Sequence, residues 1–483
     1  MTEPLRTVLV AGGGITGWYA AAAIKRRAPF LDVTMLATRA APDALADRIA
    51  CTLPSIRGFH ADLGIGEEDA VLRTGAACRL GTLFSGWADD LPDYAHVYDR
   101  YGQRFGPTSF HLHWLRARRA GRADAFDSYA PAAVLARAGR FVPPTPGTPF
   151  ADHDYGLTLD LPRQERMVRA FADHVGVRIL AGEIADVAID DRGFVARLTL
   201  VGGGSLAADL VVDATGPAAR LRGAIDQAVD DWSDWLPCDR LLIHVGAPIE
   251  PPVLTPVIAH AAGWRWTSGA QTGIAYATAH ADEAALAALM PDGDRIAIRP
   301  GMRRAPWRGN CVAIGDSATQ VEPLEWCNLH LALSAIDRLV TMLPDAAMAP
   351  VEAADFNRQC VAEAERVRDF VALHYVAARR PEPMWRACAA TPPPDSLAHT
   401  LTQFVERGRL PFYEEETFSR DEWAAVLIGQ GVLPRRVDPL VEAVPADAAA
   451  AAMARHKADI AAAVPRTPTH AAWLAAQASR LSR

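Results

Sequence analysis

Three glycines near the start of the chain have the spacing of a phosphate-binding loop. Gly12, Gly14 and Gly17 fit G-x-G-x-x-G, in which the first glycine makes a turn, the second lets a diphosphate approach the backbone, and the third lets a helix pack on a strand. The diphosphate would lie at the N-terminus of that helix, where N–H groups and the helix dipole favour an anion. The motif predicts dinucleotide binding; a plain structural turn is the alternative.

The residues around these glycines have the pattern of a βαβ unit. An apolar run at residues 7–11 precedes the glycines, an alanine-rich stretch at 18–24 follows them, and a second apolar run covers 31–36. The end of the second run is where a carboxylate normally binds the ribose hydroxyls, but Ala37 and Thr38 are found there. We predict that Thr38 contributes a hydrogen bond to the nucleotide, with a solvated loop threonine as the alternative.

Size, charge and cysteine pattern exclude several classes of protein. The 483 residues, 50% of them hydrophobic, are enough for two or three domains. The net charge of -8 gives no basic surface for nucleic acid. No apolar run is long enough to span a membrane and no leader peptide is recognisable, so we expect a cytoplasmic protein without a membrane partner. The seven cysteines are scattered without a C-x-x-C pair, so neither a metal site nor a disulfide framework is predicted.

Two later segments complete a pattern that resembles two-dinucleotide-fold flavoproteins. An apolar run ends in Asp213 and is followed by Gly216, and another ends in Gly315 and Asp316. In flavin monooxygenases of the hydroxybenzoate hydroxylase type, which this order resembles, the Gly-Asp pair contacts the ribityl chain. The resemblance implies an α/β fold with an FAD-binding domain, and it makes these four residues cofactor-binding candidates. For Asp316, capping of the local chain is the alternative.

Further segments are similar to flavin-dependent tryptophan halogenases. Trp264 and Trp266 match the Trp-x-Trp pair of that family, and residues 321–325 are similar to its Glu-Pro-Leu-Glu segment, which ends here in Glu325. Other matching segments follow in the family's order, at residues 235–240, 356–375 and 427–434. The chain is identified as a divergent member of this family.

The resemblance implies a cofactor, partners and roles. FAD, reduced by a separate flavin reductase, would react with oxygen and halide to give hypohalous acid. A lysine would pass this oxidant to an aromatic substrate, a small molecule or a peptide, beside the carboxylate of Glu325. Trp264 and Trp266 would separate substrate from flavin. A helix cap is the alternative for Glu325, core packing is the alternative for the tryptophans, and a homodimer is left open.

The sequence departs from the family mostly at functional positions. Arg79 stands where the relay lysine is expected, and a guanidinium keeps its proton at any working pH, so it is a poor nucleophile for the oxidant. Residues 326–328 are Trp-Cys-Asn in place of the Ser-Thr-Gly turn that holds halide, and we expect the indole to disfavour a compact anion nest. Residues 47–54 lack both glycines and the glutamate of the family's second flavin segment. We therefore expect FAD to bind weakly.

These observations define the expected architecture and three functions. We predict an FAD-binding domain over residues 1–345, with substrate-binding segments that form an inserted sheet near 60–150 and 220–300, and a helical C-terminal domain over 346–483. The first function is a flavin-dependent oxidoreductase, of the monooxygenase type, that acts on an aromatic or bulky organic substrate with a degenerate halogenation relay. The alternatives are an active halogenase of an indole-like substrate, in which Arg79 and Glu325 are catalytic, and a catalytically silent ligand-binding paralogue.

Overall fold

The computed structural model describes residues 3–67, 69–106 and 108–481, and the chain divides into two compact units. Unit 1 comprises Met1–Ala76, Leu159–Ser233 and Ile296–Arg368, and unit 2 comprises Ala77–Thr158, Asp234–Arg295 and Asp369–Arg483. The predicted domains 1–345 and 346–483, with insertions near 60–150 and 220–300, follow other boundaries. They stay predictions, because a compact unit is not by itself a folding domain.

Unit 1 is built on a six-stranded sheet that is parallel except at one edge. Its order is β19 (Trp307–Arg308), β20 (Cys311–Ala313), β11 (Leu210–Asp213), β1 (Thr7–Gly12), β2 (Asp32–Ala37) and β7 (Arg178–Ala181), and only β19 runs antiparallel to its neighbour. Gly12 is paired in register with Ala37, and Ala11 with Asp213. The carboxyl ends of β1, β2 and β11 therefore meet at one edge, where parallel sheets commonly bind ligands.

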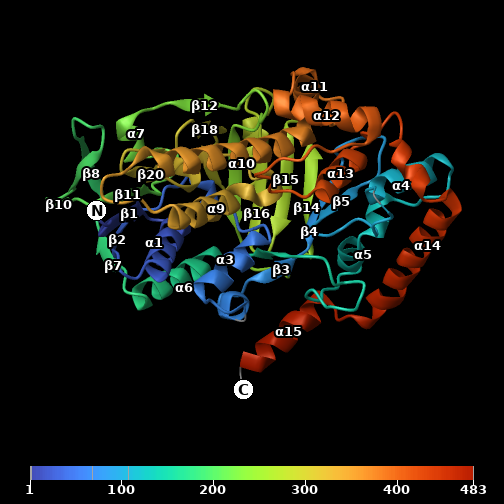
Figure 1. The fold of residues 1–483 in the computed structure, drawn as a ribbon, viewed down its shortest axis with the longest axis horizontal. Helices are drawn as coiled ribbons and strands as arrows, with labels where there is room; N and C mark the ends of the chain where they lie inside the picture. Colours follow the sequence, from blue (N-terminus) through green and yellow to red (C-terminus); the bar gives the residue numbers. More distant parts are fainter. Residues whose placement is uncertain (1–2, 68, 107, 482–483) are drawn as a thin grey trace. The chain divides into compact units, whose positions relative to one another are not determined.

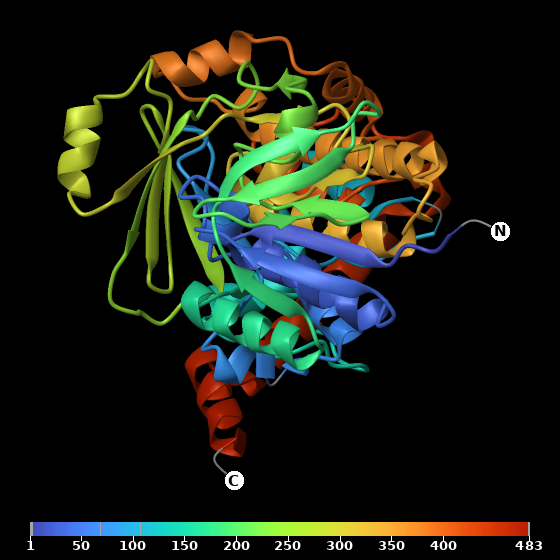
Figure 2. The ribbon, with the colours of Figure 1, turned by 90° about the vertical axis from the view of Figure 1, so that its left-hand side faces the viewer.

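Both faces of this sheet are covered. On one face α1 (Ile15–Arg27) packs between α6 (Leu161–His174) and α9 (Cys327–Thr341), and Figure 1 shows α1 beside β1 and β2. On the other face Leu9 and Ala11 pack against the small sheet of β8 (Ile184–Ile189), β9 (Val195–Leu200) and β10 (Ser205–Leu206). In Figure 2 the blue strands β1 and β2 lie side by side, flanked by green strands. Cover on both faces explains why these strands are continuous apolar runs.

The remaining elements of unit 1 are short, apart from one long helix. A third sheet contains β12 (Val229–Asp231), β18 (Gly301–Arg303) and β21 (Thr319–Gln320). The helices are α2 (Leu45–Arg48), α3 (Ser55–Leu63), α7 (Arg222–Ile225) and α10 (Pro350–Val376), whose last residues belong to unit 2. The single turn α2 follows β2 in the chain, and its residues contact the glycine loop described below.

Unit 2 contains a seven-stranded sheet and a helical C-terminal part. The strand order is β17 (Asp294–Ala297), β13 (Arg240–Val245), β16 (Gln271–Tyr276), β15 (Gly263–Ser268), β14 (Leu254–His260), β4 (Gly81–Ser85) and β5 (Tyr94–Val97), and the last two residues of β17 belong to unit 1. A separate pair joins β3 (Ala77–Arg79) to β6 (Gly156–Thr158). The helices are α4 (Phe110–Arg119), α5 (Pro131–Arg137), α8 (Glu283–Leu289), α11 (Pro383–Ala390), α12 (Asp395–Arg407), α13 (Arg420–Gly429), α14 (Ala446–Ala463) and α15 (His470–Leu481).

The predicted α/β class, with an additional sheet and a helical C-terminal part, is confirmed. The βαβ unit is present as β1, α1 and β2. The helix α6 begins at Leu161, and the carboxylate of Asp160 caps it by accepting a hydrogen bond from the backbone N–H of Arg163. The three glycines at residues 202–204 lie between β9 and β10.

Candidate functional site

The glycine loop has the tight packing that its spacing predicts. A side-chain Cβ built on Gly12 would lie 2.5 Å from the carbonyl oxygen of Ala214, and one built on Gly17 would lie 2.9 Å from Cε of Met35. Gly12 therefore lets β1 turn beside the end of β11, and Gly17 lets α1 pack closely on β2. These contacts support the first and third roles in the motif.

The second glycine faces a carboxylate. A Cβ built on Gly14 would lie 1.9 Å from Oδ2 of Asp47, and Oδ1 of Asp47 accepts hydrogen bonds from the backbone N–H (2.8 Å) and the hydroxyl (2.7 Å) of Thr16. Thr16 is in the first turn of α1, where a bound diphosphate would accept hydrogen bonds. The loop thus fits a diphosphate in shape and dipole, but a side-chain anion takes that position.

Asp316 is at the predicted place, the end of the strand pattern that contains β20, but its oxygens hold the protein chain. Oδ1 accepts from the backbone N–H of Leu45 (2.9 Å) and from Nε2 of Gln320 (3.2 Å), and Oδ2 accepts from the backbone N–H of Ala46 (2.8 Å). Burial, assisted by the charge of Asp47, raises the pKa of Asp316 to about 7. In this conformation Asp316 caps α2, which is distant in sequence, and not the local chain that the alternative interpretation named.

The preceding residue, Gly315, has φ 56° and lies against α1. A Cβ at this position would lie 3.0 Å from Cγ2 of Thr16. Gly315 therefore lets the turn after β20 approach the glycine loop, which brings Asp316 to the same edge of the sheet as Gly12 and Gly14.

Asp213 organises the end of β11 from inside the protein. It is fully buried, and its carboxylate accepts hydrogen bonds from the backbone N–H groups of Leu221 and Arg222 and from the side chains of Thr215 and Ser317. These bonds use both carboxylate oxygens. They favour a positioning role for Asp213 over direct contact with a cofactor.

Gly216 is placed beside the segment that leads into α2. Its φ is 82°, and a Cβ at this position would lie 2.6 Å from Cβ of Ala41. Only glycine therefore suits both the backbone conformation and the close approach of residues 41–44.

Thr38 lies beside the loop through its backbone. Its N–H donates to the carbonyl oxygen of Gly12 (3.3 Å), and its hydroxyl donates to the carbonyl oxygen of Arg39 (3.3 Å). A carboxylate that the sequence did not indicate reaches the same place from the loop after β7. Oε1 of the exposed Glu183 accepts a hydrogen bond from the backbone N–H of Arg39 (2.6 Å). Glu183 is thus a candidate for the ribose contact that is missing at the end of β2.

Glu325 and Trp326 form an unusual turn at the start of α9. Both are fully buried, and their φ angles are both 64°, in the left-handed region that non-glycine residues rarely adopt. Such strain is concentrated at functional sites. Cys327 then begins α9 in right-handed conformation.

The turn bears on the expectation that Trp326 would disfavour a compact anion nest. Trp326 and Cys327 adopt a left-handed and then a right-handed conformation, a backbone pattern found in anion-binding concavities, but the N–H of Trp326 already donates to the carbonyl oxygen of Pro323 (3.2 Å). The expectation therefore stays a prediction. The indole is accommodated because it is buried, so packing overrides the local preference.

In unit 2, the guanidinium of Arg79 is enclosed. Arg79 ends β3 and is fully buried, with Nε donating to the hydroxyl of Thr255 (3.2 Å) and Nη1 to the hydroxyl of Tyr98. Nη2 donates to the carbonyl oxygen of Gly81 (2.9 Å) and the hydroxyl of Thr82 (3.1 Å). The fork of the guanidinium therefore ties β3 to β4, β14 and the residue that follows β5.

Trp264 and Trp266 lie on one face of β15 and are both buried. Their ring centroids are 5.3 Å apart, and Nε1 of Trp264 donates to the hydroxyl of Tyr375 (2.9 Å). Trp266 is paired in register with Gly273 of β16, where an added Cβ would lie 1.9 Å from the indole. Gly273 therefore makes the space that the second indole occupies.

The structure thus brings the predicted cofactor residues together within unit 1, at the carboxyl ends of the parallel strands. Glu325 is also in unit 1, whereas Arg79 and the two tryptophans are in unit 2. In the sequence Asp47 marks only a departure from the family's glycine-rich flavin segment. An acidic residue in place of a glycine was the available signal, but its partner Thr16 is 31 residues away.

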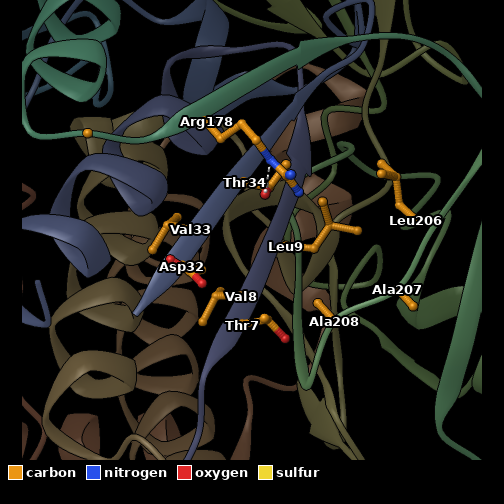
Figure 3. A pocket seen from close by; sticks show the side chains of 11 residues that line it. Thr7, Val8, Leu9, Asp32, Val33, Thr34, Arg178, Leu206, Ala207 and Ala208 are labelled. Carbon is orange, nitrogen blue, oxygen red and sulfur yellow. Dashed lines mark hydrogen bonds between the residues drawn. The ribbon is translucent and has the colours of Figure 1, made fainter. Parts of the chain in front are cut away.

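A separate cavity in unit 1 lies at the amino ends of the same strands. It has a volume of about 380 Å³, and Figure 3 shows Arg178 beside Thr34, with Nε of Arg178 donating to the threonine hydroxyl (3.1 Å). Thr7 and Asp32, the first residues of β1 and β2, also line it. This position separates the cavity from the glycine loop, which follows the other end of β1.

Over residues 3–67, 69–106 and 108–481, no group of three or more His, Cys, Asp or Glu side chains is arranged to hold a metal ion. In that same part of the chain, no helix has the length and apolar character needed to cross a bilayer.

Comparisons with known proteins agree with these landmarks. Residues 7–446 match the profile of the tryptophan halogenase family. The chain is 28% identical, over an aligned length of 503 residues, to the tryptophan 6-halogenase ThaL of Streptomyces albogriseolus, with 91% of this chain and 92% of the relative covered. Its fold is similar to that of BrvH, a flavin-dependent halogenase from Brevundimonas sp. BAL3, with a TM-score of 0.90, 35% identity and coverage of 98% and 99%. A flavin-dependent halogenase from Xanthomonas campestris gives a TM-score of 0.92, 31% identity and the same coverage.

Proposed function

Because the chain belongs to the tryptophan halogenase family, we propose that it is a flavin-dependent oxidoreductase whose halogenation relay is degenerate. Flavin-dependent halogenases use FAD that a separate flavin reductase reduces. The proposed substrate is an aromatic or other bulky organic molecule. In the proposed reaction, reduced FAD supplies two electrons, one atom of O₂ enters the substrate, and the other leaves as water.

The flavin part of the proposal is supported by the residues that converge on the glycine loop. Gly12, Gly14 and Gly17 shape the start of α1, and Gly315 and Asp316 lie beside it. Saturable FAD binding, measured by calorimetry, tests this part. Gly14→Val should abolish the binding, because its side chain would fill the approach to the backbone. Absence of binding to the wild-type protein at about 1 mM FAD would favour the silent paralogue instead.

The degenerate relay is carried by one observation, the enclosure of Arg79. A relay group must present a neutral nitrogen to the oxidant, but a guanidinium stays protonated. Each nitrogen of Arg79 already donates to Thr255, Tyr98, Gly81 or Thr82. Arg79 is therefore proposed to hold strands together, in the position where the family resemblance expects a lysine.

The decisive assay is mass spectrometry of indole and tryptophan incubated with the enzyme, a flavin reductase, FAD, NADH, oxygen and bromide. We expect no monobrominated product above the level of a reaction without enzyme and of a control with free hydrogen peroxide. A brominated product above both controls would contradict the degenerate relay.

One observation favours the second candidate, an active halogenase. The turn at Glu325 and Trp326 has the backbone pattern of an anion nest at the N-terminus of the 15-residue helix α9, which would suit halide. Glu325 would then stabilise a cationic arene intermediate by its charge. Bromination by the wild-type protein in the assay above would establish this function and require another group to replace the lysine.

A further inference from the structure

The short helix α2 is held against the proposed FAD site by two carboxylates. At one end Asp316 accepts hydrogen bonds from the backbone N–H groups of Leu45 and Ala46. At the other end the carboxylate of Asp47 lies at the start of α1 and accepts two hydrogen bonds from Thr16. A single helical turn has little stability of its own, so these contacts decide where α2 lies.

Asp47 and a diphosphate would need the same space. Oδ2 of Asp47 is 1.9 Å from the position of a Cβ on Gly14, which is the glycine that the motif reserves for the approach of the diphosphate. Both groups are oxyanions that a helix N-terminus attracts, and two anions in contact would repel each other. The carboxylate can therefore remain only when the diphosphate is absent.

Asp316 and Asp47 together form a clamp on α2, and Gln320 extends this clamp to the chain before α2. Its Nε2 donates to Oδ1 of Asp316 (3.2 Å) and to the carbonyl oxygen of Asp43 (2.9 Å). The carboxylate of Asp316, the predicted ribityl contact, is thus bound to the backbone of α2. At the same time, Asp47 occupies the position of the diphosphate. Movement of one short segment would clear both positions together.

We propose that Asp47 is a built-in substitute for the FAD diphosphate, and that FAD binds only when residues 43–48 swing away and release Thr16 and Asp316. This inference rests on the proposed flavin function. The free protein is then mostly closed, and its apparent affinity for FAD is reduced by the fraction of molecules that are open. Removal of the Asp47 carboxylate should raise the affinity without adding any contact to FAD.

The test compares Asp47→Gly with Asp43→Gly by calorimetric titration with oxidised FAD. Both variants lose one negative charge and gain one glycine in the same segment. Asp43 contributes only its backbone carbonyl to the clamp, and Asp43→Gly keeps that carbonyl. We expect Asp47→Gly to lower the Kd by about tenfold or more, and Asp43→Gly to change it by less than about threefold. Titration with ADP, which has the diphosphate but no flavin, should show a similar gain in Asp47→Gly.

A second measurement does not depend on FAD. Hydrogen exchange of the free protein should show a protected segment at Thr16 in the wild type and faster exchange there in Asp47→Gly, with α6 unchanged in both. Equal FAD affinity in the wild type and Asp47→Gly would overturn the inference and leave the flavin function standing. If neither protein binds FAD at about 1 mM, the flavin function fails and the inference fails with it.

Discussion

At the scale of single residues, the guanidinium of Arg79 makes hydrogen bonds in several directions that a lysine cannot reproduce. Thr255, Tyr98, Gly81 and Thr82 all accept from it inside unit 2. An ammonium group has three donors at one point, so some of these buried acceptors would be left without a partner. Restoring the family's lysine is therefore expected to cost stability without creating a relay.

We predict that Arg79→Lys lowers the free energy of unfolding by about 2 kcal/mol, because buried acceptors lose their donors. Urea denaturation measures this change. Arg265→Lys, at an exposed position of β15, is the matched control and should leave stability within about 0.5 kcal/mol. Arg79→Lys should also fail to brominate indole. An unchanged unfolding midpoint would show that the enclosure of Arg79 contributes nothing to the fold.

Glu183 permits a second prediction at this scale. If its carboxylate accepts from a ribose hydroxyl at the end of β2, Glu183→Gln should weaken FAD binding by about threefold to tenfold, because a charge-assisted hydrogen bond becomes neutral. Asp186→Asn, at an exposed position of the neighbouring strand β8, removes the same charge and serves as control. The Kd for FAD is measured by fluorescence titration. Equal Kd values for the two variants would mean that Glu183 contacts only the backbone of Arg39 and not the ribose.

At the scale of elements, the position of α2 is linked to proton binding. Burial raises the pKa of Asp47 to about 6 and that of Asp316 to about 7, and each of these two carboxylates has a further acidic neighbour. Glu165 of α6 acts on Asp47, and Asp47 acts on Asp316. When α2 moves away, Asp47 enters solvent and its pKa falls towards about 4. The closed form therefore binds more protons than the open form.

Because the closed form binds more protons, we predict that α2 is held most firmly at acidic pH and opens more as the pH rises through about 6 to 7. Hydrogen exchange at pH 5 and pH 8, corrected for the intrinsic exchange rate, should show lower protection of Thr16, Leu45 and Ala46 at pH 8. The backbone of α6 should keep the same protection at both values. Protection of the α2 contacts that does not change with pH would contradict the linkage.

The pairing of β15 with β16 gives another prediction about an element. Gly273→Ala should lower the free energy of unfolding by about 2 kcal/mol and shift the tryptophan signal in near-ultraviolet circular dichroism, because the new methyl group collides with the indole of Trp266. Gly58→Ala is the matched control, since no atom lies within 4 Å of its added Cβ in α3. It should raise stability by about 0.5 kcal/mol. A Gly273→Ala variant as stable as the wild type would mean that β15 tolerates a displaced indole.

At the scale of the whole molecule, the two units divide the predicted work. Unit 1 carries the glycine loop and Asp316, and unit 2 carries the tryptophan pair and Arg79. Over the residues that the structure describes, one G-x-G-x-x-G stands between a strand and a helix. The glycines at 202–204 are followed by the strand β10 instead. From this organisation we expect one dinucleotide site, with the flavin reduced by a partner protein.

We therefore predict that NADH or NADPH alone leaves bound flavin oxidised, and that an added flavin reductase starts oxygen consumption. Stopped-flow absorbance of the flavin is the measurement, with free FAD and the reductase as control. Rapid reduction by NADPH in the absence of a reductase would reveal a nicotinamide site in this chain.

Local sequence was sufficient for the cofactor fold. The apolar runs, the glycine spacing and the strand ends at Asp213 and Gly315 are short-range patterns, because a strand, a tight turn and a helix N-terminus are each specified by a few neighbouring residues. The order of the further segments identified the family. The same patterns predicted the α/β class and the helical end of the chain.

Tertiary structure alone decided how the site is filled. Asp47 reaches Thr16 across 31 residues, and Asp316 reaches Leu45 across 271. The buried indole of Trp326 holds a left-handed turn that its residue type disfavours, and Arg79 donates to Thr255, 176 residues away in sequence. Local pattern cannot predict such contacts, because packing and burial of the whole fold set which carboxylate meets which helix and which backbone strain is tolerated.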